Sequence, residues 1–383
     1  MPISFRGRRP KLLLTLAVVL VAGLVLAHPV STHLRAMSVL LRFSSPKMTG
    51  FKVRFAQHPV AEETLSAQTP WGPLRYRLYR PKDIADPPGI ILLHGIHDLG
   101  IEEPRLINFA RALSGGGVEI MTPELRDLAD YHVTSHTVDS IGISTVILCT
   151  QMKVRKVGVT GMSFAGGLAL LAASKPEYAE HIGFVVAIGA HDDLRRVSRF
   201  FATNTVEKPD GTTAPFPAHE YGVLVLAYAH LEDLFSAEDV PIAREALRLW
   251  LHEKAELSLS TAKKLTPPGQ QMFDMILHHH DVLRPRLLQE IEAHRDEMEP
   301  VSPHGQVGNI SMPVFLLHGA GDNVIPPTES EWLAHDLPAG GMKRLLISPA
   351  LIHVSMDDKV TLRQQWELID FIAQVLDRAD QNH

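Results

Sequence analysis

The stretch from residue 157 to residue 173 constrains the fold most, because a single serine joins a buried strand to a helix there. An apolar, β-branched run leads to Gly161, Ser163 follows after one residue, and a helix rich in small residues begins at about Gly166. A side chain at such a corner is pushed out of the sheet toward free backbone N–H groups at the helix start. This is the geometry that a serine nucleophile requires, because a developing oxyanion needs donors close by.

The same kind of apolar run recurs along the chain and alternates with helical spacing. Strands are expected at 89–93, 118–121, 156–160, 184–188, 313–318 and 344–348, and helices at 103–115, 138–152, 166–174 and 362–376. Short continuous apolar runs are typical of strands that are buried on both faces. The alternation therefore predicts an α/β fold with a doubly wound, mostly parallel sheet covered by helices on both sides.

The alternation stops at about Gly189 and returns at Pro313, so one α/β domain is expected to carry an insertion. The intervening chain is polar and helical in pattern, and residues 239–256 are expected to form one amphipathic helix. The expected divisions are a leader at 1–27, an approach segment at 28–61, the first part of the core at 62–190, a helical cap at 191–308 and the second part of the core at 309–383.

The approach segment and the start of the core have strand composition. Met37–Phe43 and Phe51–Phe55 are predicted to be strands, the second because it alternates apolar and basic residues. Residues 63–80 alternate on both sides of a Pro/Gly-rich turn at 69–73, which predicts an antiparallel hairpin.

The N-terminus has the pattern of a targeting segment. Four basic residues between Arg6 and Lys11 precede an uncharged apolar run at 12–27, and small residues at Val25 and Ala27 suit a signal peptidase. The run is slightly short for a membrane span of about 20 residues. A cleaved signal peptide or an N-terminal membrane anchor is expected, with the remainder exported across the cytoplasmic membrane (periplasmic or secreted) or held at it.

Charge and cysteine content exclude several classes of protein. The 383-residue chain has a net charge of −6 and no basic stripe after its N-terminus, which argues against nucleic acid as a partner. Cys149 is the single cysteine, so no intrachain disulfide or thiolate metal cluster is possible. It is expected to be a small buried side chain.

Three strand ends carry groups that act together in nucleophilic catalysis, and such ends meet at one edge of a parallel sheet. Ser163 follows the strand at 156–160, Asp322 follows the strand at 313–318, and His353 follows the strand at 344–348. An imidazole can take the proton of a serine hydroxyl, and a carboxylate behind it fixes the tautomer. Asp192 and Asp193, after the strand at 184–188, are alternative acids.

A fourth element fits these three. His94 and Gly95 follow the first buried strand, and Gly95 allows a tight turn that can direct the Ile96 N–H toward Ser163. The second donor would be the N–H of Phe164. The side chain of His94 is expected to be structural or to line a pocket.

Together these elements resemble the α/β-hydrolase fold superfamily. The resemblance rests on the His94-Gly95 turn, the Gly161-Met162-Ser163-Phe164-Ala165-Gly166 elbow, the loop from His318 to Pro326 and the late His353. It implies an eight-stranded, mostly parallel sheet with a cap at 191–308. It also implies hydrolysis through an acyl-enzyme, with Ser163 as nucleophile, His353 as base and Asp322 as acid.

The resemblance leaves the substrate open. The expected activity is cleavage of an acyl bond, with a carboxylic ester preferred, in a small-molecule or lipid-like substrate and without a metal or organic cofactor. A peptidase or amidase of the same fold, or a catalytically silent binding protein of the cell envelope, are the alternatives. His278-His279-His280-Asp281 is not expected to bind a metal, because neighbouring residues on a helix point about 100° apart.

Overall fold

The computed structural model describes the backbone of residues 9–352, 355–356 and 361–382, and the side chains of residues 27–351 and 361–382. Within these ranges, eight strands form one sheet in the order β1-β2-β4-β3-β5-β6-β9-β10. The strands are β1 Val60–Thr69, β2 Gly72–Pro81, β3 Gly89–Leu93, β4 Glu119–Pro123, β5 Val157–Met162, β6 Ile182–Ile188, β9 Val314–Gly319 and β10 Met342–Ser348.

The sheet is parallel except at one edge, where β1 and β2 run antiparallel to their neighbours. This order, with a mostly parallel sheet, is that of the α/β-hydrolase fold, so the predicted fold class is confirmed. Every residue of β3, β5, β6 and β9 is buried in its strand. Burial on both faces explains why these strands read as continuous apolar runs.

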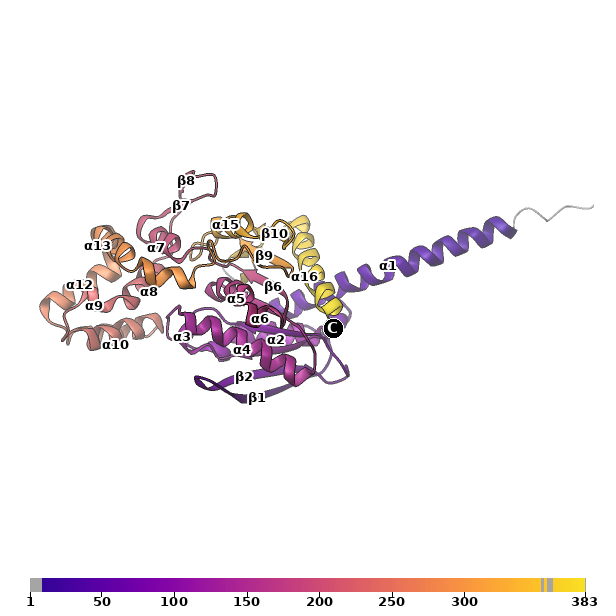
Figure 1. Ribbon diagram of the computed structural model, residues 1–383, viewed down its shortest axis with the longest axis horizontal. Coiled ribbons are helices and arrows are strands. Elements are labelled where there is room, and N and C mark those ends of the chain that lie inside the picture. The colour runs from indigo at the N-terminus through magenta and orange to yellow at the C-terminus, as the bar shows by residue number, and fades with distance from the viewer. Residues whose placement is uncertain (1–8, 353–354, 357–360, 383) are drawn as a thin grey trace, which may run out of the picture.

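Helices cover both faces of the sheet (Figure 1). One face packs against α4, α5 and α15, and the other packs against α1, α2 and α16. The core helices are α1 Arg9–Ser44, α2 Pro104–Gly115, α3 Arg126–Ala129, α4 Ser135–Met152, α5 Phe164–Ser174, α6 Pro176–Ala179, α15 Thr328–Asp336 and α16 Leu362–Asn382. Short 3₁₀ turns lie at η1 Phe51–Ala56, η2 Gly100–Glu102 and η3 Glu299–Val301.

The chain between β6 and β9 carries eight helices within the described residues, and we call this segment, α7 to α14, the cap. It has a core of its own that includes Leu247, Phe273 and Leu287. In Figure 1 its helices α8 to α13 lie at the left-hand end of the molecule. The cap helices are α7 Leu194–Thr203, α8 Tyr221–Ala229, α9 Leu231–Leu234, α10 Val240–Leu251, α11 Ala255–Ala262, α12 Pro267–His278, α13 His280–Ala293 and α14 Arg295–Met298.

Two small sheets complete the fold. The cap contains the hairpin β7 Thr205–Glu207 and β8 Thr213–Pro215, which the helical reading of this segment did not predict. β11 Leu351–Ile352 and β12 Ser355–Met356 pair after β10.

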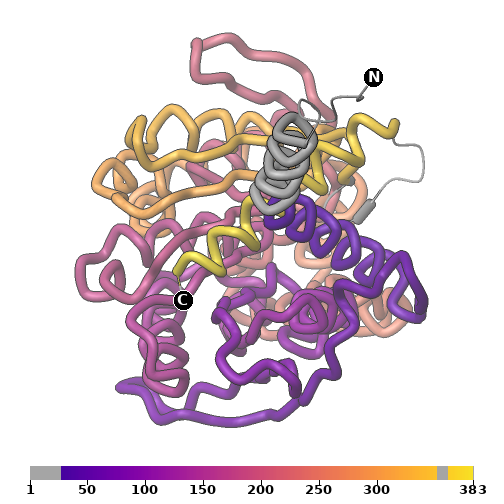
Figure 2. The backbone as a smooth tube through the Cα atoms, turned by 90° about the vertical axis from the view of Figure 1, so that its right-hand side faces the viewer, coloured from indigo at the N-terminus to yellow at the C-terminus, as the bar shows by residue number. Residues whose placement is uncertain are grey.

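The two strands predicted in the approach segment are wrong. Met37–Phe43 lies within α1, and Phe51–Phe55 lies within η1. In α1 the buried Ala36, Val39 and Leu40 follow one another at helical spacing. The helix also contacts α16, to which it is tied by an ion pair between Arg35 and Asp380 at 2.7 Å. Figure 2 shows this end of α1 beside the C-terminal helix.

Two other predictions from the sequence are confirmed. The hairpin of β1 and β2 closes through the Thr69–Gly72 pair, with two residues between the strands. Cys149 is buried, and burial raises the pKa of its thiol to about 11. No helix among the residues whose side chains are described has the length and hydropathy that a membrane span requires.

Candidate active site

Ser163 occupies the corner between β5 and α5, as predicted. Its backbone is at φ 56° and ψ −135°, a region that a residue with a side chain rarely adopts. The Ser163 N–H donates to the Ile188 carbonyl at 2.8 Å, and its own carbonyl accepts from Gly166 at 2.9 Å. Such strain costs about 1–3 kcal/mol and persists only where the surrounding structure imposes it.

The small residues around Ser163 allow the backbone to turn this tightly. A Cβ on Gly161 would lie 2.4 Å from the Ala165 carbonyl oxygen, and one on Gly166 would lie 2.8 Å from the Cβ of Ala190. The Ala165 methyl group packs in the core on one face of the sheet, and the carbonyl is the part of Ala165 that approaches Gly161. An alanine is therefore accommodated at this position of the elbow.

The turn after β3 lies directly against Ser163. A Cβ on Gly95 would lie 3.2 Å from the Cβ and 3.8 Å from the Oγ of Ser163, so a larger residue would crowd the hydroxyl. The N–H of Ile96 has no acceptor among the described residues. Phe164 is the first residue of α5, so its N–H has no acceptor within the helix. The turn that carries the Ile96 N–H and the helix start that carries the Phe164 N–H thus both adjoin Ser163.

His94 holds this turn in place. Its Nδ1 bonds to the Gly95 carbonyl at 2.8 Å, and its Nε2 accepts from the Leu125 N–H at 3.0 Å. This pattern requires the neutral tautomer with the proton on Nδ1. Burial lowers the pKa of His94, which keeps the ring neutral. The structural role expected for His94 fits these contacts.

Asp322 lies in the loop after β9, two strands away from the end of β5. Its Oδ1 accepts from the N–H groups of Val324 and Ile325 at 3.0 and 3.1 Å. Its Oδ2 lies 3.7 Å from Nε2 of His318 and 3.3 Å from where a Cβ of Gly189 would stand. Oδ1 thus fixes the carboxylate in a local turn, while Oδ2 faces the end of β6. In the sheet, β6 lies between β5 and β9.

The predicted base, His353, lies outside the described residues. The strand that precedes it, β10, ends at Ser348 and pairs in parallel with β9, the strand before Asp322. The assignment of His353 as the base therefore stays a prediction.

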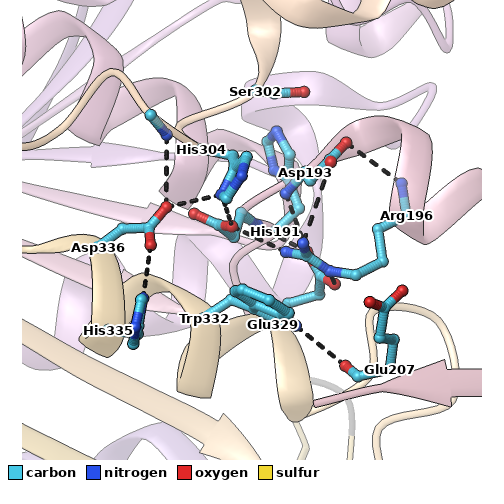
Figure 3. Close-up of polar contacts among 12 residues, drawn as sticks. His191, Asp193, Arg196, Glu207, Ser302, His304, Glu329, Trp332, His335 and Asp336 are labelled. Carbon is cyan, nitrogen blue, oxygen red and sulfur yellow. Dashed lines mark hydrogen bonds and ion pairs between the residues drawn. The ribbon is translucent and has the colours of Figure 1, made fainter. Parts of the chain in front are cut away.

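The two alternative acids have other partners, and Figure 3 shows Asp193 beside Arg196. Asp193 caps α7, because its Oδ1 accepts from the backbone of Arg195 and Arg196. Asp192 is fully buried and pairs with the Arg196 guanidinium at 2.8 Å. Arg196 also pairs with Glu329 at 2.6 Å. Burial and the nearby Glu329 raise the pKa of Asp192 to about 7, although Arg196 opposes this. These contacts are those of a cluster that ties the cap to α15.

The adjacent histidines of the cap do not act as one group. Nε2 of His280 bonds to the Ile276 carbonyl at 2.9 Å, and His279 lies 3.3 Å from Asp274. His278 ends α12, whereas His280 begins α13. The three side chains therefore belong to different local arrangements.

Two cavities meet at the turn that carries Ile96. A cavity of about 60 Å³ is lined by Ser163, His94, Gly95 and Ile96 together with Phe43, His97, Glu103, Arg105 and Met162. A larger cavity of about 230 Å³, which we call the cap cavity, lies between the core and the cap. Ile96 and Phe164 form its core side, and residues such as Phe201, Val225 and Met298 form its cap side.

Tyr131 contributes to the cap cavity and was not identified from the sequence. It adopts φ 64°, which is rare for an aromatic residue, and its hydroxyl donates to the Leu251 carbonyl of the cap at 3.0 Å. The hydroxyl thus fastens the loop after β4 to α10. A single tyrosine in a loop offers no sequence pattern by which this contact could be found.

Comparisons with known proteins give similar solved structures but no matching family. No family model matches the sequence, and no curated protein matches it. The chain is similar to an esterase from the archaeon Pyrobaculum calidifontis, with 16% identity, a TM-score of 0.47, and coverage of 92% of this chain and 93% of that one.

Two further solved structures are similar at the same level. They are the Pyrococcus horikoshii acylaminoacyl peptidase (14% identity, TM-score 0.48, 80% of this chain and 40% of that one) and the enol-lactonase from Burkholderia xenovorans LB400 (16% identity, TM-score 0.41, 82% and 99%). The chain thus spans less than half of the peptidase. The strand order and the corner at Ser163 define the class of the molecule, the α/β-hydrolase fold with a capped candidate site.

Proposed function

We propose that the protein is a serine hydrolase that cleaves acyl bonds, with a carboxylic ester as the preferred substrate. The observation that carries this proposal is the strained backbone of Ser163, held against the turn at Gly95. Strain of this kind collects at functional sites, because an ordinary turn would relax to a cheaper conformation.

In the proposed reaction the Ser163 hydroxyl attacks the substrate carbonyl to form an acyl-enzyme. His353 would take the hydroxyl proton and return it to the leaving group, and Asp322 would orient His353 and stabilise the imidazolium. Water would then attack the acyl-enzyme, with His353 taking the proton of the water and returning it to the Ser163 oxygen as the acid is released.

The oxyanion that forms during attack would be held by the N–H groups of Ile96 and Phe164. Ser163 has only 7% of its surface exposed, so charge that develops there lies in a poorly solvated place. Donors that are fixed before the reaction need no reorganisation, and each one contributes about 3–4 kcal/mol in well-studied cases. Both donors belong to backbone that is fixed by neighbouring structure, the His94 contacts on one side and α5 on the other.

We further propose that the cap cavity accepts the acyl chain. It borders both oxyanion residues, and most of its wall is apolar. Its volume of about 230 Å³ corresponds to about eight heavy atoms at roughly 30 Å³ each, the volume of a water molecule in the liquid. Acyl chains of up to about eight carbons should therefore be preferred over longer ones.

A series of p-nitrophenyl esters with increasing acyl length tests this assignment. Val225→Phe places a larger side chain in the cavity wall and should reduce kcat/KM for the longest accepted chains while acetate is still hydrolysed. Val282→Phe, on an exposed position of the same cap, is the matched control and should leave the profile unchanged. An unaltered profile in Val225→Phe would place the acyl chain elsewhere. Cleavage of the matching anilides, rather than the esters, would favour an amidase.

We also keep export or membrane anchorage as a proposal, supported by the basic residues that precede the uncharged run at 12–27. Sequencing the N-terminus of the mature protein tests it. A start at residue 28 supports a signal peptide, and retention of residues 1–27 in a membrane fraction supports an anchor. An intact chain in the cytoplasmic fraction would contradict both.

A further inference from the structure

A cluster of two histidines and two carboxylates lies in the cap, at the edge of the cap cavity. The side chains of His230, Asp233 and His294 each offer one ligand atom, and these atoms lie within 4.8 Å of one another. His230 directly precedes α9 and Asp233 lies within it, whereas His294 lies 61 residues beyond Asp233, between α13 and α14. Separate elements of the cap thus converge here.

The contacts of His294 resemble those of a metal-binding histidine. Its Nε2 lies 2.8 Å from Oδ2 of Asp233, and its Nδ1 lies 3.1 Å from Oε1 of Glu297. Histidines that bind metals commonly donate their second ring nitrogen to a carboxylate, which fixes the ring and raises its basicity. Glu297 would keep that supporting role, and a metal would replace the hydrogen bond between Nε2 and Asp233, with both of those atoms becoming ligands.

His230 has ring nitrogens that are free to bind. Neither nitrogen has a hydrogen-bond partner among the described residues, although the side chain is partly buried. Its ring packs on that of His294 with the centroids 4.2 Å apart. A ring nitrogen that no protein group occupies can bind a metal ion without the loss of an existing hydrogen bond, and imidazole is the commonest metal ligand in proteins.

A second cluster of the same kind, Asp192, His304 and Asp336, is less suited to a metal. The guanidinium of Arg196 donates to Asp192 Oδ2 at 2.8 Å, and the same oxygen lies 3.2 Å from His304. A cation already holds the ligand atom there, as Figure 3 shows for the neighbourhood of Arg196 and His304. No arginine or lysine pairs with the Asp233 carboxylate among the described residues.

We propose that His230, Asp233 and His294 form a binding site for a divalent transition-metal ion, with Zn²⁺ as the best match. Two imidazoles and one carboxylate are a common zinc ligand set, with bonds of about 2.0–2.2 Å. In tetrahedral geometry, bonds of this length place donor atoms roughly 3.4 Å apart, so small side-chain rotations would close the observed spacing. Three protein ligands leave a fourth position for water or another ligand.

The site would also lie at the edge of the cap cavity, because His230, Glu297 and Met298 belong to its wall. A metal there would add a polar group to the end of the cavity formed by the cap. Metal binding does not require Ser163 to be a nucleophile, so the two proposals fail or succeed separately.

Direct binding to the full-length protein tests the site. After treatment with a chelator, Co²⁺ is titrated while its visible absorption is recorded, and Zn²⁺ is then added as a competitor. One equivalent of Co²⁺ should bind with the intense bands of a low-coordinate site, and Zn²⁺ should displace it. His230→Ala and Asp233→Asn should abolish the bands, and Glu297→Gln should weaken binding about 10- to 100-fold.

Three controls make the result specific. His304→Ala removes a histidine of the second cluster, His279→Ala removes an exposed cap histidine, and Ser163→Ala removes the proposed nucleophile. All three should bind Co²⁺ as the unmodified protein does. The proposal is overturned if the unmodified protein binds no stoichiometric metal, if binding survives both His230→Ala and Asp233→Asn, or if His304→Ala abolishes it. Circular dichroism of each variant separates loss of ligands from loss of fold.

Discussion

Replacement of Ser163 by glycine should be tolerated better, relative to alanine, than the same replacement at a buried serine with ordinary backbone geometry. At φ 56° and ψ −135° any residue with a Cβ is strained by about 1–3 kcal/mol, and glycine is not. Against this, glycine loses the buried Cβ group, about 0.8 kcal/mol, and pays about 0.4–1 kcal/mol more backbone entropy than alanine. These two costs, about 1.2–1.8 kcal/mol together, offset much of the strain, so an internal control is needed to measure it.

Ser144 provides that control. It is a fully buried serine in the middle of α4 with ordinary helical geometry, and its hydroxyl donates to the Ser140 carbonyl at 2.7 Å. Glycine should be less stable than alanine there by about 1.5–2 kcal/mol, because the same buried methyl is lost and glycine disfavours helices. When the glycine-minus-alanine difference at Ser144 is subtracted from that at Ser163, the contributions of the lost methyl group and of backbone entropy nearly cancel. The remaining difference measures the strain, about 1–3 kcal/mol.

The measurement is urea unfolding of the four variants, with the free energy of unfolding taken from each curve. The glycine-minus-alanine difference should be more favourable at Ser163 than at Ser144 by at least 1 kcal/mol. Equal differences at the two sites, within about 0.5 kcal/mol, would refute the idea that the Ser163 corner stores strain.

Three further predictions follow from the same structure. Gly161→Ala should destabilise the fold by about 1–3 kcal/mol, because its Cβ would lie 2.4 Å from the Ala165 carbonyl oxygen. Gly308→Ala, whose Cβ would have no atom within 4 Å, should change the free energy of unfolding by less than about 1 kcal/mol. Urea unfolding of both variants checks this prediction. Asp322→Asn should lower kcat on a p-nitrophenyl ester by a factor on the order of 10⁴ without unfolding the chain, since an amide oxygen still accepts the two loop N–H bonds; activity near that of the unmodified protein would remove Asp322 from the mechanism. The pKa of Asp192 is raised to about 7, so between about pH 4 and pH 7 the folded chain holds a proton that the unfolded chain has lost. The free energy of unfolding contributed by this group therefore falls as pH rises through that window. Unfolding curves of Asp192→Asn should lack this part of the decline.

The sheet was predictable from the sequence because its strands are buried on both faces. Continuous apolar runs such as the one at 89–93 leave little choice of conformation once helical spacing follows them. The corner at Ser163 was predictable because Gly161 and Gly166 mark where backbone approaches backbone. In both places the local sequence favours the backbone conformation that the tertiary structure requires.

The approach segment shows where this agreement ends. Met37–Phe43 is short and mostly apolar, and such a run is compatible with either a strand or a buried helix turn. Packing against α2 and α16 selects the helix, and those partners are distant in sequence. Composition alone therefore assigned the wrong element.

The cap contacts were beyond sequence reasoning for a similar reason. Arg196 and Glu329 are 133 residues apart, and His294 lies 61 residues from Asp233. The histidines that drew attention in the sequence, at 278–280, are adjacent but contact different partners. Proximity in the chain did not indicate proximity in space.

The central claim is that Ser163 is an activated nucleophile, and covalent labelling tests it most directly. The unmodified protein is incubated with a fluorophosphonate probe, and the intact mass and the modified peptide are determined by mass spectrometry. We predict one adduct per chain, located on Ser163, and none on Ser163→Ala. Labelling that persists in Ser163→Ala, or an unmodified protein that does not react although it is folded, would contradict the account.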